Sequence, residues 1–384
     1  MSAPPAAARG APATATLLAA AALTLMAAAV IAPALPAMAA AYAGTPGAEL
    51  LVRLAIGSTS LAIAVSAPAA GVLADRIGRA PLLTGGLLLY AVSGAAGYFL
   101  TTLPAVLASR VLLGIAVGGV MTAVTASLTD RYEGPLRALW LGRQQAAASL
   151  GGVVFLPLAG VLGGLDWRLP FWLHAAAAPI AVAAALLVRD GARAPAPAPA
   201  GERGGSGSTG IYLLALTATL AFFMAPTQLP FLLAEQGASA AAIGAIVAGS
   251  TLTSIAGALL FPRLRAHLSP ATVTAASLAL LGLGWLVAGT AAHPAQVLAG
   301  LLVGGFGVGA LVPNLNLRLG ELAPADRRGR VLSGLVTAVF LGQFLSPLAL
   351  APLIAAIGIA GAFTTTGLAL LGAGLLLRQK GRKS

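Results

Sequence analysis

The 384-residue sequence contains no cysteine. This absence excludes a disulfide framework, a thiol nucleophile and any metal site built on cysteine. Charge is also scarce, because Asp, Glu, Lys and Arg make up 8% of the chain, whereas a soluble domain carries about 25%. The three histidines, His174, His267 and His293, lie far apart in sequence and form no ligand cluster, so we expect no metal site. With 59% hydrophobic residues and a mean hydropathy of +0.95, the chain is expected to be an integral membrane protein.

Acidic residues are fewer than basic ones, and the net charge is +12. In a soluble protein this excess would indicate nucleic-acid binding. In a chain this apolar, arginines in loops instead set the orientation of membrane spans, and we expect no nucleic-acid partner. No Asp or Glu lies in the middle of any span predicted below.

Apolar segments of about 20 residues, the length that crosses a hydrocarbon core of about 30 Å, recur along the chain. Those of the first half are residues 15–39, 50–73, 81–100, 103–127, 138–162 and 167–188. Those of the second half are residues 211–234, 240–261, 271–291, 296–317, 331–353 and 359–377. The first segment exceeds the apolar core of about 7–15 residues in a signal peptide, so we expect it to be a retained helix.

The two sets of six spans are separated by a stretch rich in Pro, Gly and Ser, RDGARAPAPAPAGERGGSGSTG. This composition cannot build a core and is typical of a flexible linker. We therefore predict an all-α protein with twelve transmembrane helices in two six-helix bundles related by pseudo-two-fold symmetry. The predicted bundles are residues 1–189 and 211–384, joined by a cytoplasmic linker of residues 190–210.

The basic residues support this map. With the N-terminus inside, all but three of the 22 basic residues fall in segments assigned to the cytoplasmic side. The exceptions are Arg53, Arg110 and Arg168. This bias predicts that both termini are cytoplasmic.

A short charged segment lies between spans two and three, in GVLADRIGRAP, Gly71 to Pro81. A loop that only fixes topology needs arginines, but it does not need Asp75 or the glycines. We therefore predict a second role for this turn, with topology alone as the alternative. A related sequence follows span eight, where Arg265 takes the place of Arg79 and Phe261 that of Asp75.

Two further motifs lie inside spans. Span four contains ASRVLLGIAVGG, with Arg110, Gly114 and Gly118, and span five contains GVVFLPLAG, with Gly152, Pro157 and Gly160. Small residues at such spacings let helix backbones approach in lipid. Prolines in spans one and seven, at Pro33, Pro36, Pro226 and Pro230, predict kinks in both helices.

Taken together, these motifs resemble the major facilitator superfamily, and within it the twelve-span drug/proton antiporters. The turn matches G-x-x-x-D-R-x-G-R, and span four resembles the family's intramembrane R-x-x-x-G pattern. Span five resembles G-x-x-x-G-P-x-x-G-G, although Leu156 and Val161 replace two of its glycines. The resemblance covers essentially the whole chain.

The resemblance implies that the turn switches the transporter between conformations. Its expected partners are Asp130 at the end of span four and the start of span eleven, near Arg330 and Val331. A carboxylate at a helix N-terminus contributes about 0.3–1 kcal/mol, and several such contacts would favour the outward-facing state. The predicted switch residues are Gly71, Asp75, Arg76, Gly78, Arg79, Asp130, Arg137 and Arg328.

Many antiporters of this type carry an acid in span one, and this chain does not, so proton coupling would need other residues. The candidates for coupling are Arg110, Asp75, Glu49 and Glu235, with His174 as a further possibility. Arg110 lies inside span four, where an arginine costs about 2.5–3.5 kcal/mol on insertion scales. The alternative is that Arg110 snorkels to the outer interface. Arg53 is expected to pair with Glu49, one turn earlier.

The predicted substrate cavity is mostly apolar. A lipophilic compound suits it better than a polyol, which needs many hydrogen-bonding partners. Each candidate could instead pack against a neighbouring helix or face lipid. The candidate lining residues are Gln228, Phe222, Phe223, Met224, Asn314 and Gln343.

From these observations we predict a secondary transporter that exports small, largely hydrophobic compounds, driven by proton exchange and without a cofactor. The alternatives are an uptake carrier or uniporter of the same fold and a non-transporting membrane sensor. No catalytic cluster is present in the sequence, so we do not expect an enzyme. We expect a monomer in the inner membrane of a bacterium, with a small-molecule substrate and the lipid bilayer as its partners.

Overall fold

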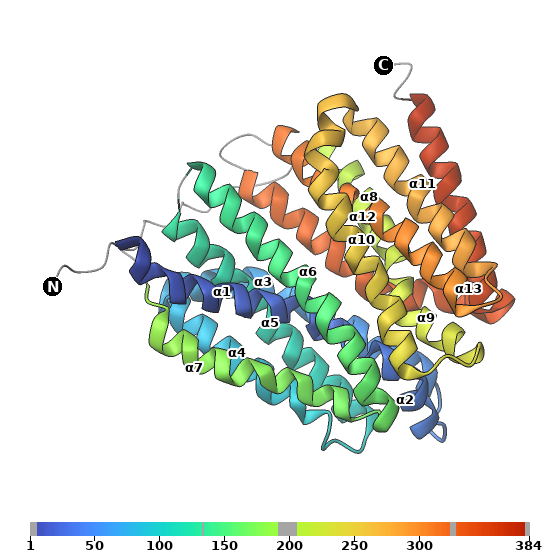
Figure 1. The fold of residues 1–384 in the computed structure, drawn as a ribbon, viewed down its shortest axis with the longest axis horizontal. Coiled ribbons are helices and arrows are strands. Elements are labelled where there is room, and N and C mark those ends of the chain that lie inside the picture. The colour runs from blue at the N-terminus through green and yellow to red at the C-terminus, as the bar shows by residue number, and fades with distance from the viewer. Residues whose placement is uncertain (1–5, 133, 191–205, 323–327, 381–384) are drawn as a thin grey trace. The chain divides into compact units, whose positions relative to one another are not determined.

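The computed structural model describes residues 6–132, 134–190, 206–322 and 328–380. Near several ends of these ranges it describes only the backbone. Every regular element in this part of the chain is a helix (Figure 1). The elements of the first half are α1 (Ala6–Ala29), η1 (Ala32–Ala34), α2 (Leu35–Ala41), α3 (Ala48–Ile77), α4 (Arg79–Ala96), α5 (Leu103–Arg131), α6 (Gly134–Leu165), η2 (Leu169–Ala176) and α7 (Ala177–Leu187). Those of the second half are α8 (Ser206–Phe222), α9 (Met224–Glu235), α10 (Ala240–His267), α11 (Pro270–Gly289), α12 (Pro294–Leu322) and α13 (Arg328–Lys380).

The helices match the predicted spans. Ten segments of the described chain are long and apolar enough to cross a membrane. One of them, Gly334–Gln379 in α13, is interrupted at Gly358, where φ is +74°, and so comprises two spans. The 18-residue helix α4 accounts for the remaining predicted span. The all-helical membrane architecture predicted from the sequence is therefore confirmed.

Two spans are broken where the prolines predict. A proline lacks the N–H that would bond to the carbonyl four residues earlier. Pro33 follows Ala29, the last residue of α1, by four positions, and Pro226 follows Phe222, the last residue of α8, by the same spacing. The chain continues as η1 and α2 in the first span and as α9 in the seventh.

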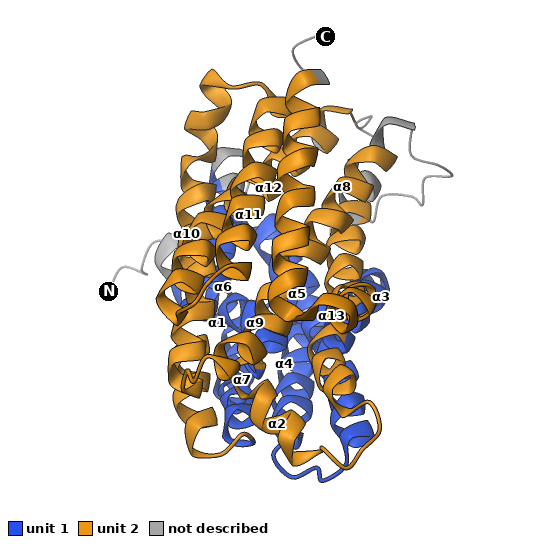
Figure 2. Ribbon diagram, turned by 90° about the vertical axis from the view of Figure 1, so that its right-hand side faces the viewer, with its two compact units in different colours: residues 1–31, 58–155, 168–198 blue, residues 32–57, 156–167, 199–384 orange. Residues whose placement is uncertain are grey.

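By its contacts the chain divides into two compact units, coloured separately in Figure 2. Unit 1 comprises residues 1–31, 58–155 and 168–198. Within it, α4 packs against α5, α7 and η2, and α1 packs against α5 and α7. Fully buried side chains, including those of Tyr90 and Phe171, fill its core.

Unit 2 comprises residues 32–57, 156–167 and 199–384. In this unit α11 packs against α12 and α13, α10 against α12, and α8 against α13. Glycines bring α11 and α12 close together, since a Cβ on Gly284 would lie 2.8 Å from the backbone nitrogen of Gly304. The buried Trp285 donates a hydrogen bond from its indole N–H to the carbonyl of Ala221 at 2.8 Å.

Segments 32–57 and 156–167, from the first half of the chain, therefore group by contacts with the second half. The division into bundles of residues 1–189 and 211–384 stays a prediction. Most of the predicted linker, residues 191–205, lies outside the described residues.

Candidate functional site

The charged turn between spans two and three is shorter than the sequence suggests. Helix α3 continues to Ile77 and α4 begins at Arg79, so the predicted turn from Gly71 to Pro81 is wrong in extent. Nothing in the intervening VLADRI interrupts a helix, and Pro81 lies in the first turn of α4, where its missing N–H costs no hydrogen bond. The connection is Gly78 alone, whose φ of +97° favours glycine.

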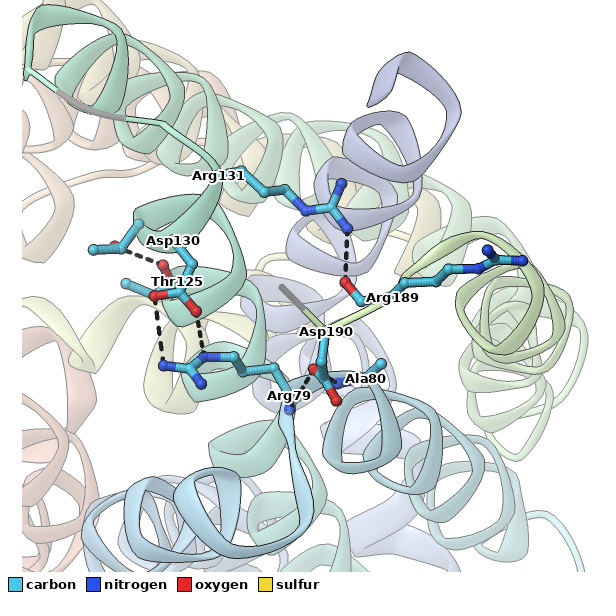
Figure 3. A network of polar contacts seen from close by, with 8 residues as sticks. Arg79, Ala80, Thr125, Asp130, Arg131, Arg189 and Asp190 are labelled. Atoms are coloured by element: carbon cyan, nitrogen blue, oxygen red, sulfur yellow. Dashed lines mark hydrogen bonds and ion pairs between the residues drawn. The ribbon is translucent and has the colours of Figure 1, made fainter. Parts of the chain in front are cut away.

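Arg79 forms an ion pair with Asp130 near the end of α5 (Figure 3). Nε of Arg79 lies 2.6 Å from Oδ2 of Asp130, and Nη2 lies 3.4 Å from Oδ1. The two side chains are 18% and 33% exposed, so water and salt screen the pair only in part. The contact expected between the turn and the end of span four is present, and its role in gating stays a prediction.

A second carboxylate binds the same turn. Oδ1 of Asp190, which follows α7, accepts hydrogen bonds from the backbone N–H groups of Arg79 at 2.8 Å and Ala80 at 2.9 Å (Figure 3). These N–H groups have no partner inside α4, and negative charge is favoured at a helix N-terminus. A Cβ on Gly78 would lie 3.1 Å from Cγ of Asp190, so glycine is also needed for space.

Sequence reasoning missed Asp190 because it assigned this residue to the flexible linker. The available signal was an acid placed directly after a span. A cavity of about 310 Å³ adjoins the turn, lined by charged residues of both signs that include Arg79, Arg131, Asp130 and Asp190. Nη2 of Arg131 donates to the carbonyl of Arg189 at 3.4 Å, which joins the end of α5 to the residues after α7.

The remaining predicted switch residues lie apart from this network. Asp75 and Arg76 are exposed in the last turns of α3, and within the described part of the chain they form no hydrogen bond or ion pair. Gly71 is also in α3, with nothing within 4 Å of the position that a Cβ would take. The side chains of Arg137 and Arg328 lie outside the described residues.

Arg110 is buried in unit 1, with 1% of its surface exposed. Its Nη2 donates to the carbonyls of Ser93 at 3.1 Å and Gly94 at 2.7 Å, and its guanidinium carbon lies 4.7 Å from the centroid of the Phe171 ring. Both carbonyls belong to the last turn of α4, where they lack a helical partner and where a cation is favoured. Arg110 therefore caps α4, and the alternative that it snorkels to the interface is wrong.

The groups around Arg110 are polar but uncharged. Tyr90 donates from its hydroxyl to the carbonyl of Leu23 at 2.8 Å. The fully buried ring of His174 lies 5.5 Å from that of Tyr90, and its Nδ1 is 2.9 Å from the carbonyl oxygen of Phe171. Among the described residues no carboxylate pairs with Arg110, so backbone carbonyls and an aromatic face stabilise its charge. Its predicted role in proton coupling stays a prediction.

Arg53 is the corresponding buried cation of unit 2. Its Nη2 lies 2.5 Å from Oε1 of Glu49, which confirms the expected pair one helical turn apart. The side chain of Arg53 is 8% exposed and that of Glu49 is 58% exposed. The guanidinium lies 4.4 Å from the centroid of the Phe231 ring on α9, and the exposed Glu235 ends the same helix. This contact connects the start of α3 to α9.

A cavity of about 120 Å³ lies in unit 2 among α8, α12 and α13. Sites for drug-sized ligands are about 300–1,000 Å³, so this cavity accommodates only a small group in this conformation. Two of the predicted cavity residues, Phe222 and Gln343, line it. The other lining side chains are those of Ala215, Ala218, Thr219, Val308, Leu311, Val312, Leu315, Leu335 and Val339.

The other predicted cavity residues lie elsewhere in unit 2. Phe223 and Met224 are buried at the break between α8 and α9. Asn314 donates to Oγ1 of Thr274 at 2.9 Å, which ties α12 to α11. Gln228 is fully buried, and neither of its amide atoms has a hydrogen-bond partner among the described residues. Such an unsatisfied group costs about 1–3 kcal/mol.

The glycines of spans four and five pack helices closely, as expected. In unit 1, a Cβ on Gly114 would lie 2.6 Å from Cβ of Ala62 on α3. In unit 2, a Cβ on Gly160 would lie 3.0 Å from Cα of Ala241, at the start of α10. The other motif glycines, Gly118 and Gly152, are buried, and α6 continues through Pro157.

A sequence model of the Major Facilitator Superfamily matches residues 17–209 and 211–383, nearly the whole chain. The chain is a member of this superfamily. This superfamily consists of secondary transporters rather than enzymes.

Two relatives are similar to the chain over part of their length. The chain is 32% identical to the minor myo-inositol transporter IolF of Bacillus subtilis (strain 168) over 120 residues, 30% of this chain and 27% of that protein. It is 33% identical to multidrug resistance protein 1 of the same organism over 123 residues, 32% of each chain. The aligned part thus spans about a third of these relatives.

Among solved structures, a D-xylose–proton symporter resembles the chain with a TM-score of 0.78. The match covers 95% of this chain and 96% of the symporter at 14% sequence identity. This similarity shows that the fold is shared over nearly the full length of both proteins.

Proposed function

We propose that this transporter exports small, largely hydrophobic compounds by alternating access, in exchange for protons. The observation that carries the proposal is the cavity among α8, α12 and α13. Of its described lining residues, Thr219 and Gln343 carry polar side chains and none is charged. Such a lining suits an apolar group and offers too few partners for a polyol. The similarity to a multidrug resistance protein supports export.

The proposal is tested by measuring flux in proteoliposomes with an imposed pH gradient. The panel consists of neutral apolar drugs, lipophilic cations and small polar metabolites. We expect flux of the neutral apolar compounds that depends on the protein and rises with the gradient. Flux of polar metabolites alone would reject the substrate class, and no flux under any gradient would indicate a sensor instead.

Uptake by the same fold is the second candidate, and the similarity to an inositol transporter favours it. Direction is decided by the accumulation of a fluorescent apolar dye in cells with and without the gene. Export predicts lower accumulation when the protein is present, so higher accumulation would contradict it.

We further propose that bundles of residues 1–189 and 211–384 rock against each other, joined by the linker of residues 190–210. The bias of arginines toward one set of loops supports cytoplasmic termini. The composition supports a bacterial inner membrane, and we propose a monomer. Labelling single cysteines with a membrane-impermeant reagent tests the orientation, and the natural chain contributes no background cysteine. Labelling of a cysteine at Arg76 from outside intact cells would overturn it.

The turn at Gly78 is proposed as the inner gate. Its support is the ion pair of Arg79 with Asp130, which a conformational change can break and reform. The exposed Asp75 has no described partner in this conformation and is available to bind one in another. Asp75→Asn should leave the amount of protein in the membrane unchanged but reduce transport. Unchanged transport would remove Asp75 from the gate.

For proton coupling, the geometry favours Glu49 over Arg110, because the buried Arg110 is already engaged by carbonyls of α4. Glu49 is exposed and pairs with the nearly buried Arg53. Protonation of Glu49 would leave Arg53 without its counter-charge and weaken the contact of α3 with Phe231 on α9. Glu49→Gln should abolish gradient-driven transport yet retain substrate exchange at equal pH. Gradient-driven transport at the natural rate would exclude Glu49 as the proton-coupling residue. Asp75, Glu235 and Arg110 would then be the remaining candidates.

A further inference from the structure

Gln228 is an unusual residue for the interior of unit 2. It is fully buried on α9, and both Oε1 and Nε2 lack hydrogen-bond partners among the described residues. Burying an amide without partners costs free energy, whereas a leucine of similar volume would not incur this cost. The position therefore lowers the stability of the protein in this conformation, which suggests that a molecule outside the chain supplies the partners.

Another buried amide in the same unit, that of Asn314, differs in that its donor group is hydrogen-bonded. Nδ2 of Asn314 donates to the carbonyl of Pro270 at 3.0 Å and to Oγ1 of Thr274 at 2.9 Å. Asn314 thus links two helices through its donor group and has a structural role. Gln228 links nothing in the described chain, so a structural role does not account for it.

The surroundings of Gln228 suit an occluded binding position. Helix α9 packs against η1, α2, α10 and α13, and it follows the break that Pro226 produces after Phe222. Gln228 follows Phe222, which lines the apolar cavity, by six positions across this break, and six residues at a helical rise span about 9 Å. A compound of ordinary drug size could place an apolar group in that cavity and a polar group at Gln228.

The chemistry indicates a neutral polar group. The elements η1, α2 and α8 contain no charged residue, and the one charge of α9 is Glu235 at its end. The basic residues of α10 and α13 lie toward the ends of those helices. The nearby Arg53, which lies over Phe231, already pairs with Glu49. A carboxamide side chain presents one acceptor and one donor side by side, which matches a ligand amide edge to edge.

We propose that Gln228 is a substrate-binding residue that recognises a neutral amide-type group, as in a primary amide, a lactam or a urea, on an otherwise apolar substrate. This inference rests on the proposed transport of hydrophobic compounds and specifies which of them bind. A compound that lacks the donor leaves the buried amide unsatisfied, so the site discriminates against it.

The test compares 1-naphthamide with N,N-dimethyl-1-naphthamide, which has the same apolar body but no N–H donor. Binding to the purified full-length protein is measured by fluorescence, and transport is measured in proteoliposomes. We expect the natural protein to bind 1-naphthamide roughly tenfold or more tightly than the dimethyl compound. In Gln228→Leu this preference should disappear while the melting temperature is retained or rises.

Asn314→Leu is the matched control, because Nδ2 of its buried amide is bonded within the protein, although Oδ1 has no partner among the described residues. This variant should lower the melting temperature and keep the preference for 1-naphthamide. The proposal is overturned if Gln228→Leu lowers the melting temperature as much as Asn314→Leu does, if it keeps the preference, or if the natural protein shows none. If hydrophobic compounds are transported but Gln228→Leu changes nothing, only the present inference fails. If the preference depends on Gln228 but no compound is transported, only the proposed function fails.

Discussion

The turn between α3 and α4 and its counterpart between α10 and α11 are held in different ways. At the first turn, Arg79 pairs with Asp130, 51 residues away, and its backbone N–H donates to Asp190, 111 residues away. At the second, Arg265 donates to the carbonyl of Leu268 at 2.8 Å, and the hydroxyl of Ser269 accepts the N–H of Thr272. At the second turn the hydrogen-bond partners come from the turn itself, whereas at the first turn they come from distant parts of unit 1.

The sequence difference that produces this contrast is small. Aligning Arg79 with Arg265 places Gly78 opposite Leu264 and Asp75 opposite Phe261. Without a glycine, the helix continues past Leu264 to His267, and a Ser–Pro pair then starts α11. A turn that is tied to other helices can respond when those helices move, and a turn closed on itself cannot. We therefore expect only the first turn to take part in switching.

The largest expected effect follows from breaking the long-range ion pair. Asp130→Asn removes the charge that Arg79 faces, and hydrogen bonds to charged groups contribute about 1.5–3 kcal/mol. Transport in proteoliposomes should fall roughly tenfold, the equivalent of about 1.4 kcal/mol. Restored transport in the exchanged pair Arg79→Asp with Asp130→Arg would show that the contact itself matters. Full transport activity of Asp130→Asn alone would contradict the expectation that the first turn takes part in switching.

The next effect concerns the glycine that connects α3 and α4. Gly78→Ala should destabilise the protein by about 1–3 kcal/mol of backbone strain, and by more because the new Cβ displaces Asp190. Gly237 also has a positive φ, +79°, but open space where a Cβ would lie, so Gly237→Ala isolates the strain. Melting temperatures in detergent should fall further for Gly78→Ala. Equal losses would mean that the contact with Asp190 contributes nothing.

A smaller effect is expected from the charge at the start of α4. Asp190→Asn keeps an oxygen acceptor for the N–H groups of Arg79 and Ala80 but removes the negative charge. The loss should be about 0.3–1 kcal/mol at low ionic strength and should shrink in concentrated salt. Thermal unfolding at two salt concentrations measures it. A loss that is independent of salt would point to hydrogen-bond geometry rather than charge.

The smallest effect is expected at the second turn. Arg265→Gln removes one local hydrogen bond to an exposed carbonyl, so stability should change by less than about 0.5 kcal/mol and transport should not change. Transport assays beside Asp130→Asn provide the comparison. A loss of transport similar to that of Asp130→Asn would show that both turns switch.

Much of the fold is predictable because it depends on local sequence. Span length and polarity place the helices, Pro33 and Pro226 place the breaks, and the spacing of Glu49 and Arg53 predicts their pair. The site is less predictable, because its contacts join segments that are distant in sequence. No local sequence signal predicts that Arg110 caps α4. None predicts which turn Asp190 binds. Likewise, whether a buried amide such as that of Gln228 or Asn314 finds a hydrogen-bond partner depends on how the helices face each other.

The single residue that joins the two arms of α13 has a practical consequence. Because α13 passes from one span to the next at Gly358 without an intervening loop, the exposed residues 355–358 present little extended backbone to a protease. A reporter or affinity sequence inserted at that point would have to force the hairpin apart. During synthesis, the last two spans should enter the bilayer together as one unit.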